Sequence, residues 1–360
     1  MDRRKFLVST GTAAAASALP WRGAPAADVW TTYQVTTHVD VADPRGLTQA
    51  WIPLPLSIDT PWFKNIGSSW SGNALRAEIA ADGKYGLTMV HAAWRGGEAK
   101  PAIEVTSRFM TREAVTDLSR PADSAERLSA ADRAFYTAPT ELIPTDGIVR
   151  DTAHEVTKGA KTDVEKARAI YEWVVENTYR DPKTRGCGWG DIKSMLEAKN
   201  YGGKCGDLNT MFVGLARAAG IPARDVYGVR VAPSKYGYKS LGAGSPDISK
   251  AQHCRAMFFA EGYGWVPVDP ADVRKVMLEE PPGHLAIDNP KVAAARKRLF
   301  GSWEMNWLAY NMGHDVALPG SRGPRLPYLM YVNAESGGER RDQLDPASVK
   351  YKIVSQGALD

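Results

Sequence analysis

The sequence predicts an α+β protein in which β structure precedes a core made of a helix and an antiparallel sheet. Apolar residues alternate with polar ones through much of residues 30 to 115, which is typical of half-buried strands. A helical pattern begins at Cys205, and two short apolar runs follow it near residues 253–260 and 264–268. With 360 residues, 44% of them hydrophobic, the chain is long enough for two domains.

The β-rich region shows period-two patterns on both sides of a turn signal. Two sets of residues alternate in this way, and Asp82-Gly83 between two strand-like runs predicts a hairpin. The sets are Val35, Thr37, Val39 and Val41, and Ile103, Val105, Ser107 and Phe109. The run Trp51-Ile-Pro-Leu-Pro-Leu56 contains two prolines and is interpreted as an extended edge strand. We therefore expect a β-sandwich over residues 28–118.

A helical segment is expected to lead into the core. Residues 116–160 are polar and contain several prolines, which fits a linker with one or two short helices. Thr162 and Glu165 then form a capping box, and apolar residues recur at helical spacing as far as Thr178.

Cys205 is the strongest candidate for chemistry. It follows Gly202-Gly203-Lys204 and stands where a helix is expected to begin. Unpaired N–H groups and the positive end of the helix dipole would stabilise its thiolate and lower its pKa. The glycines leave room for a substrate backbone near the sulfur.

His253 and Asp269 complete a pattern for nucleophilic catalysis. His253 opens the first apolar run, and Asp269 closes the second, 16 residues later. The tight turn Glu261-Gly-Tyr-Gly264 predicts a hairpin that would bring the two together. A thiol, a base and an orienting carboxylate are the groups that thiol-dependent acyl transfer needs.

The ordered motifs resemble the transglutaminase-like superfamily, whose core is papain-like. They are Gly203-Lys-Cys205-Gly-Asp207, the helix that follows, His253, and Trp265-Val-Pro-Val-Asp269-Pro270. The resemblance covers roughly residues 160–275 and implies that Cys205, His253 and Asp269 are a catalytic triad. The family often has an aromatic residue two positions after the histidine, where this chain has Arg255.

Other interpretations of the three cysteines stay open. Cys205 could be an inert core thiol. A zinc site of Cys187, Cys205, Cys254 and His253 is disfavoured because no C-x-x-C pair is present. If a disulfide forms, Cys187 to Cys254 is the pairing compatible with catalysis, although we expect Cys254 to be a buried free thiol. Strand alternation predicts that Cys254 points away from Cys205 if His253 points toward it.

The oxyanion hole is only half defined by the sequence. The backbone N–H of Cys205 is the natural first donor for a tetrahedral intermediate. Trp189, Asn200 and Tyr201 are the candidates for a second donor.

The N-terminus is interpreted as a twin-arginine-type signal peptide over residues 1–27. Arg3-Arg4-Lys5 precedes a run of small uncharged residues, and Ala24-Pro-Ala26 offers a cleavage site. We therefore expect a periplasmic or secreted protein. Without this segment the formal charge falls from +4 to about +1, which does not support a nucleic-acid partner. The remaining chain has no apolar run long enough to span a membrane.

The remaining segments are given structural roles. Residues 119–275 are the expected catalytic core with its helical lead-in, and residues 276–360 an irregular, aromatic-rich C-terminal extension. Within the core, residues 232–252 are rich in Gly and Tyr and lead directly into His253. They are expected to be either a substrate-shaping loop or a surface excursion.

Three functions are compatible with these residues. The first is an exported thiol peptidase or amidase acting on a peptide or protein amide through a thioester at Cys205. The second is a transglutaminase-type amine acyltransferase, and the third is a non-catalytic binding or scaffold protein. No D-x-D-x-D calcium loop is visible, so no cofactor or metal is expected.

Overall fold

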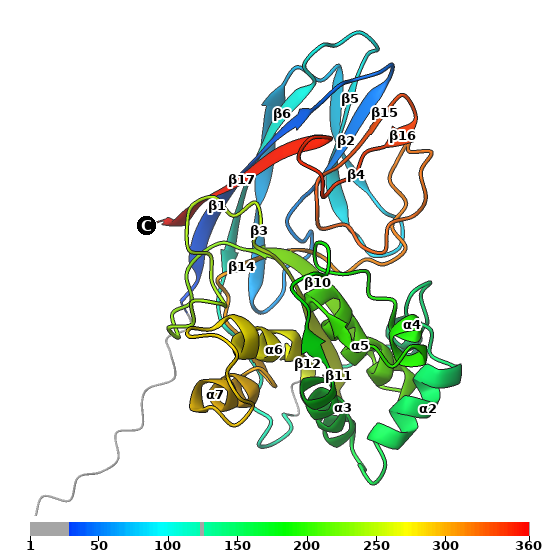
Figure 1. The fold of residues 1–360 in the computed structure, drawn as a ribbon, viewed down its shortest axis with the longest axis vertical. Helices are drawn as coiled ribbons and strands as arrows, with labels where there is room; N and C mark the ends of the chain where they lie inside the picture. The colour runs from blue at the N-terminus through cyan, green and yellow to red at the C-terminus, as the bar shows by residue number, and fades with distance from the viewer. Residues whose placement is uncertain (1–28, 123–125, 360) are drawn as a thin grey trace, which may run out of the picture.

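The computed structural model describes residues 29–122 and 126–359 and divides into a β-sheet half and a helical half (Figure 1). The signal peptide predicted at residues 1–27 lies outside the described residues. Within them, no helix is both long and apolar enough to cross a membrane.

The first sheet of the β half has the strand order β17-β1-β6-β3. Its strands are β1 (Thr31–Val41), β3 (Phe63–Gly72), β6 (Ala102–Thr111) and β17 (Val349–Leu359). Both alternating sets predicted from the sequence lie here, in β1 and β6, and all their members are buried. The period-two pattern therefore identified the inner face of this sheet correctly.

The second sheet has the order β16-β15-β2-β5-β4. Its strands are β2 (Thr48–Pro53), β4 (Arg76–Ala81), β5 (Thr88–Trp94), β15 (Asn333–Ser336) and β16 (Glu339–Arg340). Antiparallel pairing of β4 with β5 across Asp82 confirms the predicted hairpin.

The prediction that Trp51 to Leu56 forms an edge was wrong. Strand β2 lies between β15 and β5, and every residue in it is buried. Ile52 faces the core between the sheets, whereas Trp51 packs on Leu318 and Leu329 from the C-terminal part of the chain. Both faces are covered, which explains why Trp51 and Ile52 are both apolar, and Pro53 is the last residue of the strand.

The two sheets pack face to face through a shared core. Residues from β1, β2, β5, β6 and β17 meet in it: Val39, Ile52, Trp94, Ile103 and Val349. This is a sandwich, but β15, β16 and β17 belong to residues 276–360. That region is therefore not irregular throughout, because its strands complete both sheets.

The second half contains the helices and a third sheet. The expected linker forms α1 (Ala130–Thr137) and α2 (Gly147–Val156), and the capping box of Thr162 and Glu165 begins α3 (Asp163–Asn177) as predicted. The other helices are α4 (Ile192–Glu197), α5 (Cys205–Ala218), α6 (Pro270–Glu279) and α7 (Pro290–Arg298).

The third sheet has the order β12-β11-β10-β14 and supports α5, which packs on β10 and β11. Its strands are β10 (Ala223–Arg230), β11 (Gln252–Ala260), β12 (Gly264–Val268) and β14 (Trp307–Asn311). Two short pairs add β7 (Ala114–Val115) with β13 (Ser302–Trp303), and β8 (Tyr179–Arg180) with β9 (Gly202–Gly203). A helix against an antiparallel sheet is the predicted core.

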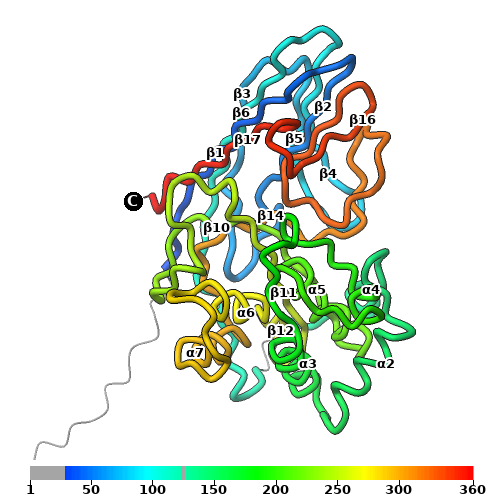
Figure 2. The backbone as a smooth tube through the Cα atoms, viewed as in Figure 1, coloured from blue at the N-terminus to red at the C-terminus, as the bar shows by residue number. Residues whose placement is uncertain are grey.

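Strand β17 joins the two halves. One edge pairs with β1, while Ile353 and Ser355 on the same strand exchange backbone hydrogen bonds with Ile248 and Pro246 of the loop before β11. Figure 2 shows the C-terminal strand running past this loop. The loop is thereby fixed against the β half and is not a free surface excursion.

Candidate functional site

Asp207 anchors the start of α5 and so sets the position of Cys205. Its carboxylate accepts backbone hydrogen bonds from Lys204, Trp189 and Gly190, each at 3.0 Å. A Cβ on Gly188, whose φ is +90°, would lie 1.8 Å from an Asp207 oxygen. The glycine-rich loop can therefore pass close to the helix start only because it lacks side chains.

Three thiols gather at this helix start. The sulfurs of Cys187, Cys205 and Cys254 all lie within 4.8 Å of one another, and each residue is a buried free cysteine. Hydrogen bonds from Cys187 and Cys254, followed by one from His253, lower the pKa of Cys205 well below its ordinary value against the opposing effect of burial. Cys205 is therefore the thiol of the three that ionises first.

The expectation that Cys254 points away from Cys205 was wrong. Helix α5 packs directly on β11, so its first residue contacts side chains that leave the strand in both directions. His253 and Cys254 thus both contact Cys205, but their other partners differ. The His253 ring bonds Asp269, whereas the Cys254 sulfur faces Cys187, Cys205 and Met330, whose sulfur lies 3.9 Å away.

His253 and Asp269 form a buried pair, with 2.7 Å between Nε2 and Oδ2. The hairpin register pairs Ala256 with Val268, so Asp269 follows opposite Arg255 and reaches back along the same face to His253. Since Nε2 is bound to Asp269, Nδ1 is the nitrogen left for the Cys205 thiol. The predicted hairpin is confirmed, but its register is offset from direct opposition.

Asp269 is held by several donors in addition to His253. It caps α6 by accepting the Asp272 backbone N–H at 3.0 Å, and Asn209 Nδ2 donates to the same oxygen at 3.1 Å. Asn209 also donates to the carbonyl of Cys254, so α5 fixes β11 and the carboxylate together. Asp269 therefore has little freedom to leave the His253 ring.

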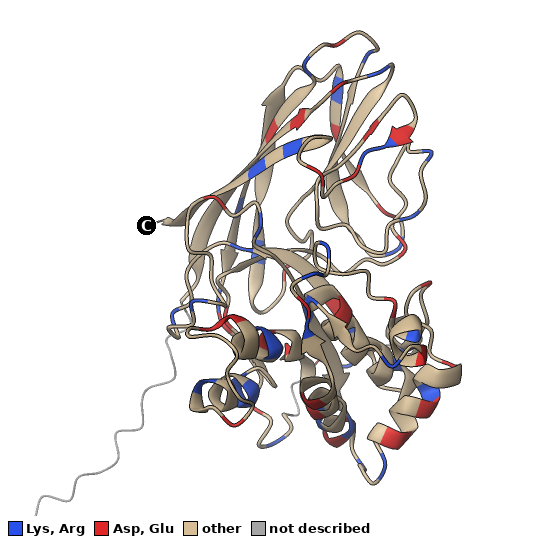
Figure 3. Cartoon of the chain, viewed as in Figure 1, with Lys and Arg blue, Asp and Glu red and all other residues tan. Residues whose placement is uncertain are grey.

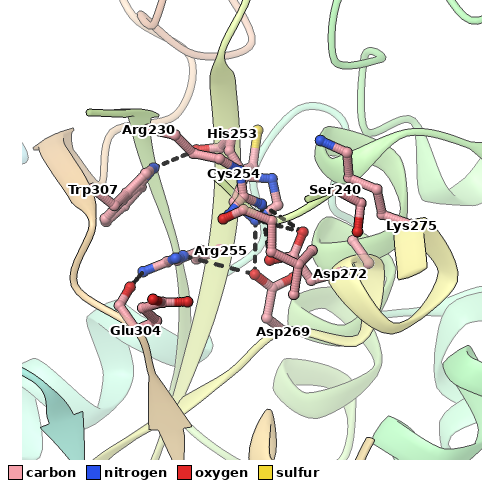
Figure 4. Close-up of polar contacts among 12 residues, drawn as sticks. Arg230, Ser240, His253, Cys254, Arg255, Asp269, Asp272, Lys275, Glu304 and Trp307 are labelled. Carbon is pink, nitrogen blue, oxygen red and sulfur yellow. Dashed lines mark hydrogen bonds and ion pairs between the residues drawn. The ribbon is translucent and has the colours of Figure 1, made fainter. Parts of the chain in front are cut away.

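Asp272 and Arg230 are site residues that the sequence analysis missed. Arg230 Nη2 contacts both carboxylate oxygens of Asp272 at 2.6 and 2.8 Å, and Asp272 Oδ1 lies 3.3 Å from His253 Nε2 (Figure 4). Burial and Arg230 act to lower the pKa of His253, but Asp272 and Asp269 prevail and raise it above 6.5. Asp272 lies at N3 of α6, a position that the sequence could have indicated as part of a helix cap, but nothing marked Arg230 as its partner.

Arg255 stands where the family often has an aromatic residue, and it lies behind Asp269. Its Nη1 donates to the Glu304 carbonyl at 2.9 Å, its guanidinium lies 4.7 Å from the Trp307 ring centre, and its Nε lies 3.7 Å from Asp269 (Figure 4). Burial lowers the pKa of Arg255 to about 10. The side chain is 2% exposed, so it does not form a substrate subsite.

The three oxyanion candidates lie away from the open space beside Cys205. Trp189 is 68% exposed and gives its backbone N–H to Asp207. Asn200 accepts from the Tyr179 hydroxyl at 3.0 Å, and the Tyr201 ring packs on Trp173. None of the three is among the residues that line the cleft described below.

A cleft of about 780 Å³ opens beside Cys205 and His253. One wall comes from the helical half, and the other from β17 with the loop between β10 and β11. Gly242, Gly244 and Ser249 of that loop line the cleft, which supports its predicted role in shaping a substrate site. Cys205 is 3% exposed, so this cleft is its route to solvent among the described residues.

Two groups of residues here have the chemistry to hold a metal ion: the three sulfurs, and His253 with Asp269 and Asp272. Thiolates favour soft ions such as Zn²⁺, with metal–sulfur distances near 2.3 Å. Sulfurs up to 4.8 Å apart would have to draw together to share one ion. The zinc hypothesis named Cys187, Cys205, Cys254 and His253. The fold brings the three cysteines together although the sequence has no C-x-x-C pair.

Comparison with known proteins places the site within a matched region. Residues 150–270 match the family model of the transglutaminase-like superfamily. An uncharacterised protein of Haemophilus influenzae is 34% identical over 343 residues, covering 90% of this chain and 91% of that protein. The matched family region contains Cys205, His253 and Asp269.

One solved structure shares the fold. A candidate cysteine protease from Cytophaga hutchinsonii is similar with a TM-score of 0.52 and 15% identity, covering 91% of this chain and all of that one. The periplasmic domain of TgpA from Pseudomonas aeruginosa is similar more weakly, with a TM-score of 0.34 and 12% identity over 72% of this chain and 97% of that domain.

Proposed function

Since this chain belongs to the transglutaminase-like superfamily, we propose that it is an exported cysteine-dependent acyl-transfer enzyme, a thiol peptidase or amidase. The observation that carries the proposal is the His253–Asp269 contact of 2.7 Å beside the Cys205 thiol, at the base of an open cleft. An intact set of nucleophile, base and orienting carboxylate argues against a purely binding or scaffold role.

The first half of the reaction forms a thioester. The Cys205 sulfur attacks the carbonyl carbon of the substrate amide while His253, charged and bonded to Asp269, stands beside it. The C–N bond then breaks, and His253 gives its proton to the departing amine. Among the described residues the Cys205 backbone N–H has no backbone partner, so it is free to donate to the tetrahedral oxyanion.

The second half releases the acyl group. His253 takes a proton from a water molecule, whose oxygen attacks the thioester carbonyl, and the Cys205 thiolate leaves. If an amine attacks instead, the product is a new amide and the enzyme is a transglutaminase-type acyltransferase. Both reactions use the same residues and differ only in the attacking group.

Export is part of the proposal and rests on the twin-arginine-type sequence at residues 1–27. Cleavage after the small residues near Ala26 would leave the described structure complete, because it begins at residue 29. Fractionation of cells that express the full chain, with and without Arg3→Lys and Arg4→Lys, tests this. Retention of the double variant in the cytoplasm is expected, and its unchanged export would remove a twin-arginine route.

The catalytic role is tested by mapping thiol alkylation with mass spectrometry. Cys205 should react far faster than Cys187 or Cys254, because its pKa is lowered by hydrogen bonds from Cys187, Cys254 and His253. Equal labelling of all three, or no labelling of Cys205, would overturn the assignment. Screening the wild type and Cys205→Ala on peptide and cell-wall amides, for hydrolysis and for amine incorporation, then separates the hydrolase from the acyltransferase.

A further inference from the structure

The cleft beside Cys205 is lined by far more positive than negative side chains. The whole chain is nearly balanced, with 45 Lys and Arg against 41 Asp and Glu. The cleft has seven Lys and Arg but only two carboxylates: Arg180, Lys204, Arg230, Lys250, Lys275, Lys350 and Lys352, against Asp40 and Asp247. The positive charge is therefore concentrated where a substrate would lie.

Three of these cations form ion pairs with carboxylates of the protein itself. Arg230 is paired with Asp272, and both Arg180 and Lys275 contact Glu279. These side chains lie on the helical wall and are largely buried. They contribute to the site's structure but are not the charges most available to a ligand.

The other four cations have no carboxylate within 4.0 Å among the described residues, and three of them form the opposite wall. Lys350 and Lys352 project from β17, a strand that contains no Asp or Glu (Figure 3), and Lys250 lies in the loop bonded to β17. All three are exposed. Lys204 precedes the nucleophile itself and is half-buried.

The neighbouring carboxylates do not cancel this charge. Asp247 is bound to the Ser249 side chain and backbone, and Lys352 and Lys250 act on it only as secondary influences on its pKa, which is lowered. Asp40 is the register partner of Lys350 on β1 but makes no ion pair with it. Two carboxylates thus face four unpaired ammonium groups.

We propose that this cleft selects negatively charged acyl substrates, and that the lysine wall of Lys250, Lys350 and Lys352 recognises acidic side chains of a peptide. The inference rests on the proposed function and names the substrate class for that site. A cleft lined by one sign of charge, with low-dielectric walls, focuses the field and raises the local concentration of oppositely charged ligands. Peptide carboxylates fit this wall because ammonium groups at exposed positions bind them as point charges.

The test uses a matched pair of thiol reagents that differ in charge. Iodoacetate is anionic and iodoacetamide is neutral, so the ratio of their second-order rates at Cys205 reports the potential in the cleft. The reference is the same ratio for free glutathione. In the full mature protein the ratio should favour iodoacetate by about tenfold over the reference at low salt, and the preference should shrink as ionic strength rises.

Charge reversal locates the effect. Lys350→Glu with Lys352→Glu should abolish the anion preference and leave the iodoacetamide rate nearly unchanged, because neither side chain touches Cys205. Lys158→Glu with Lys161→Glu, which makes the same change in net charge outside the cleft, should retain the preference. Lys350→Gln with Lys352→Gln should give an intermediate ratio and serves if the reversed variant does not fold.

The substrate arm uses peptide pairs that differ only in Glu against Gln next to the scissile amide. The acidic member should have the higher kcat/KM, by roughly tenfold, and the Lys350 and Lys352 reversal should remove the difference. If Cys205 reacts rapidly but without charge preference, the anion inference is wrong while the nucleophile stands. If Cys205 does not react with either reagent, the proposed function itself fails.

Discussion

The two walls of the cleft hold their charges in opposite ways. On the helical wall, His253, Asp269, Asp272 and Arg230 are at most 3% exposed, and each is in contact with another of the four. On the β17 wall, Lys350 and Lys352 are exposed and lack a carboxylate partner. Buried, mutually bonded charges have a fixed geometry that suits chemistry, whereas exposed, unpaired charges remain free to meet a ligand.

The largest effect should come from breaking the helical wall at Asp269. Asp269→Asn preserves shape but removes the charge that orients His253, and turnover should fall on the order of 10³-fold or more. The pKa of His253 is raised by Asp272 and then Asp269 against burial and Arg230, so losing Asp269 lowers it. The imidazolium then supports the Cys205 thiolate less well, and the acid limb of the alkylation profile should move to higher pH.

Stopped-flow alkylation across a pH series measures that shift. A profile that stays unchanged in Asp269→Asn would show that Asp269 does not act through His253. Asp247→Asn provides a matched control, because it removes an exposed cleft carboxylate that does not contact the triad.

The next largest effect should be on the free energy of unfolding. It is tested by replacing one cation from each wall of the cleft. Arg230→Met leaves Asp272 buried without its partner, and we expect a loss of about 3 to 5 kcal/mol in the free energy of unfolding. Lys350→Met on the exposed wall should change stability by no more than about 0.5 kcal/mol. Urea unfolding of both variants measures these changes. Equal losses of stability would mean that the cations of the two walls do not differ in their contribution to folding.

A smaller effect is expected from the thiol neighbours of Cys205. The pKa of Cys205 is lowered first by the hydrogen bond from Cys187 and next by that from Cys254. Cys187→Ala should therefore slow alkylation of Cys205 several-fold below neutral pH and leave the rate unchanged in strong base, where the thiolate forms without help. A uniform slowing at all pH values would instead indicate a packing defect.

The smallest effect should follow metal removal. Because the proposed steps use only protein side chains and water, prolonged treatment with a chelator should leave turnover unchanged. Added Zn²⁺ or Cd²⁺ should inhibit, since the three clustered sulfurs favour soft ions. Loss of activity on chelation, restored by one metal, would overturn the expected cofactor independence.

The parts of the site that could be predicted are those that depend on neighbouring residues in the sequence. The glycine pair before Cys205 and the hairpin that ends at Asp269 each give a short-range signal, and so do the capping box of α3 and the alternation in β1. The register of the hairpin was harder to predict from the sequence. Arg255, two residues after His253, lies opposite Asp269, yet His253 is still within reach of the Asp269 carboxylate.

The parts that could not be predicted depend on partners distant in sequence. Arg230 contacts Asp272, which lies 42 residues later in the sequence, and Cys187 lies close to Cys254, 67 residues later. No rule of sequence spacing predicts either contact. Strand β17 was not predicted because its pairing partner, β1, lies more than 300 residues earlier in the chain. The lysines of the cleft were visible as residues, but only that pairing brings Lys350 and Lys352 to the cleft that Cys205 also lines.

The pairing of Thr37 with Ile353 also orders events during synthesis. The sheet that holds Cys205, His253 and Asp269 together can be completed once β14 has emerged from the ribosome, but the lysine wall cannot form until translation has passed Ile353. A growing chain would therefore expose Cys205 in a half-open state, with one side of the cleft missing. If the wall selects substrates as proposed, selectivity is the last property this protein acquires, and it comes only with complete folding.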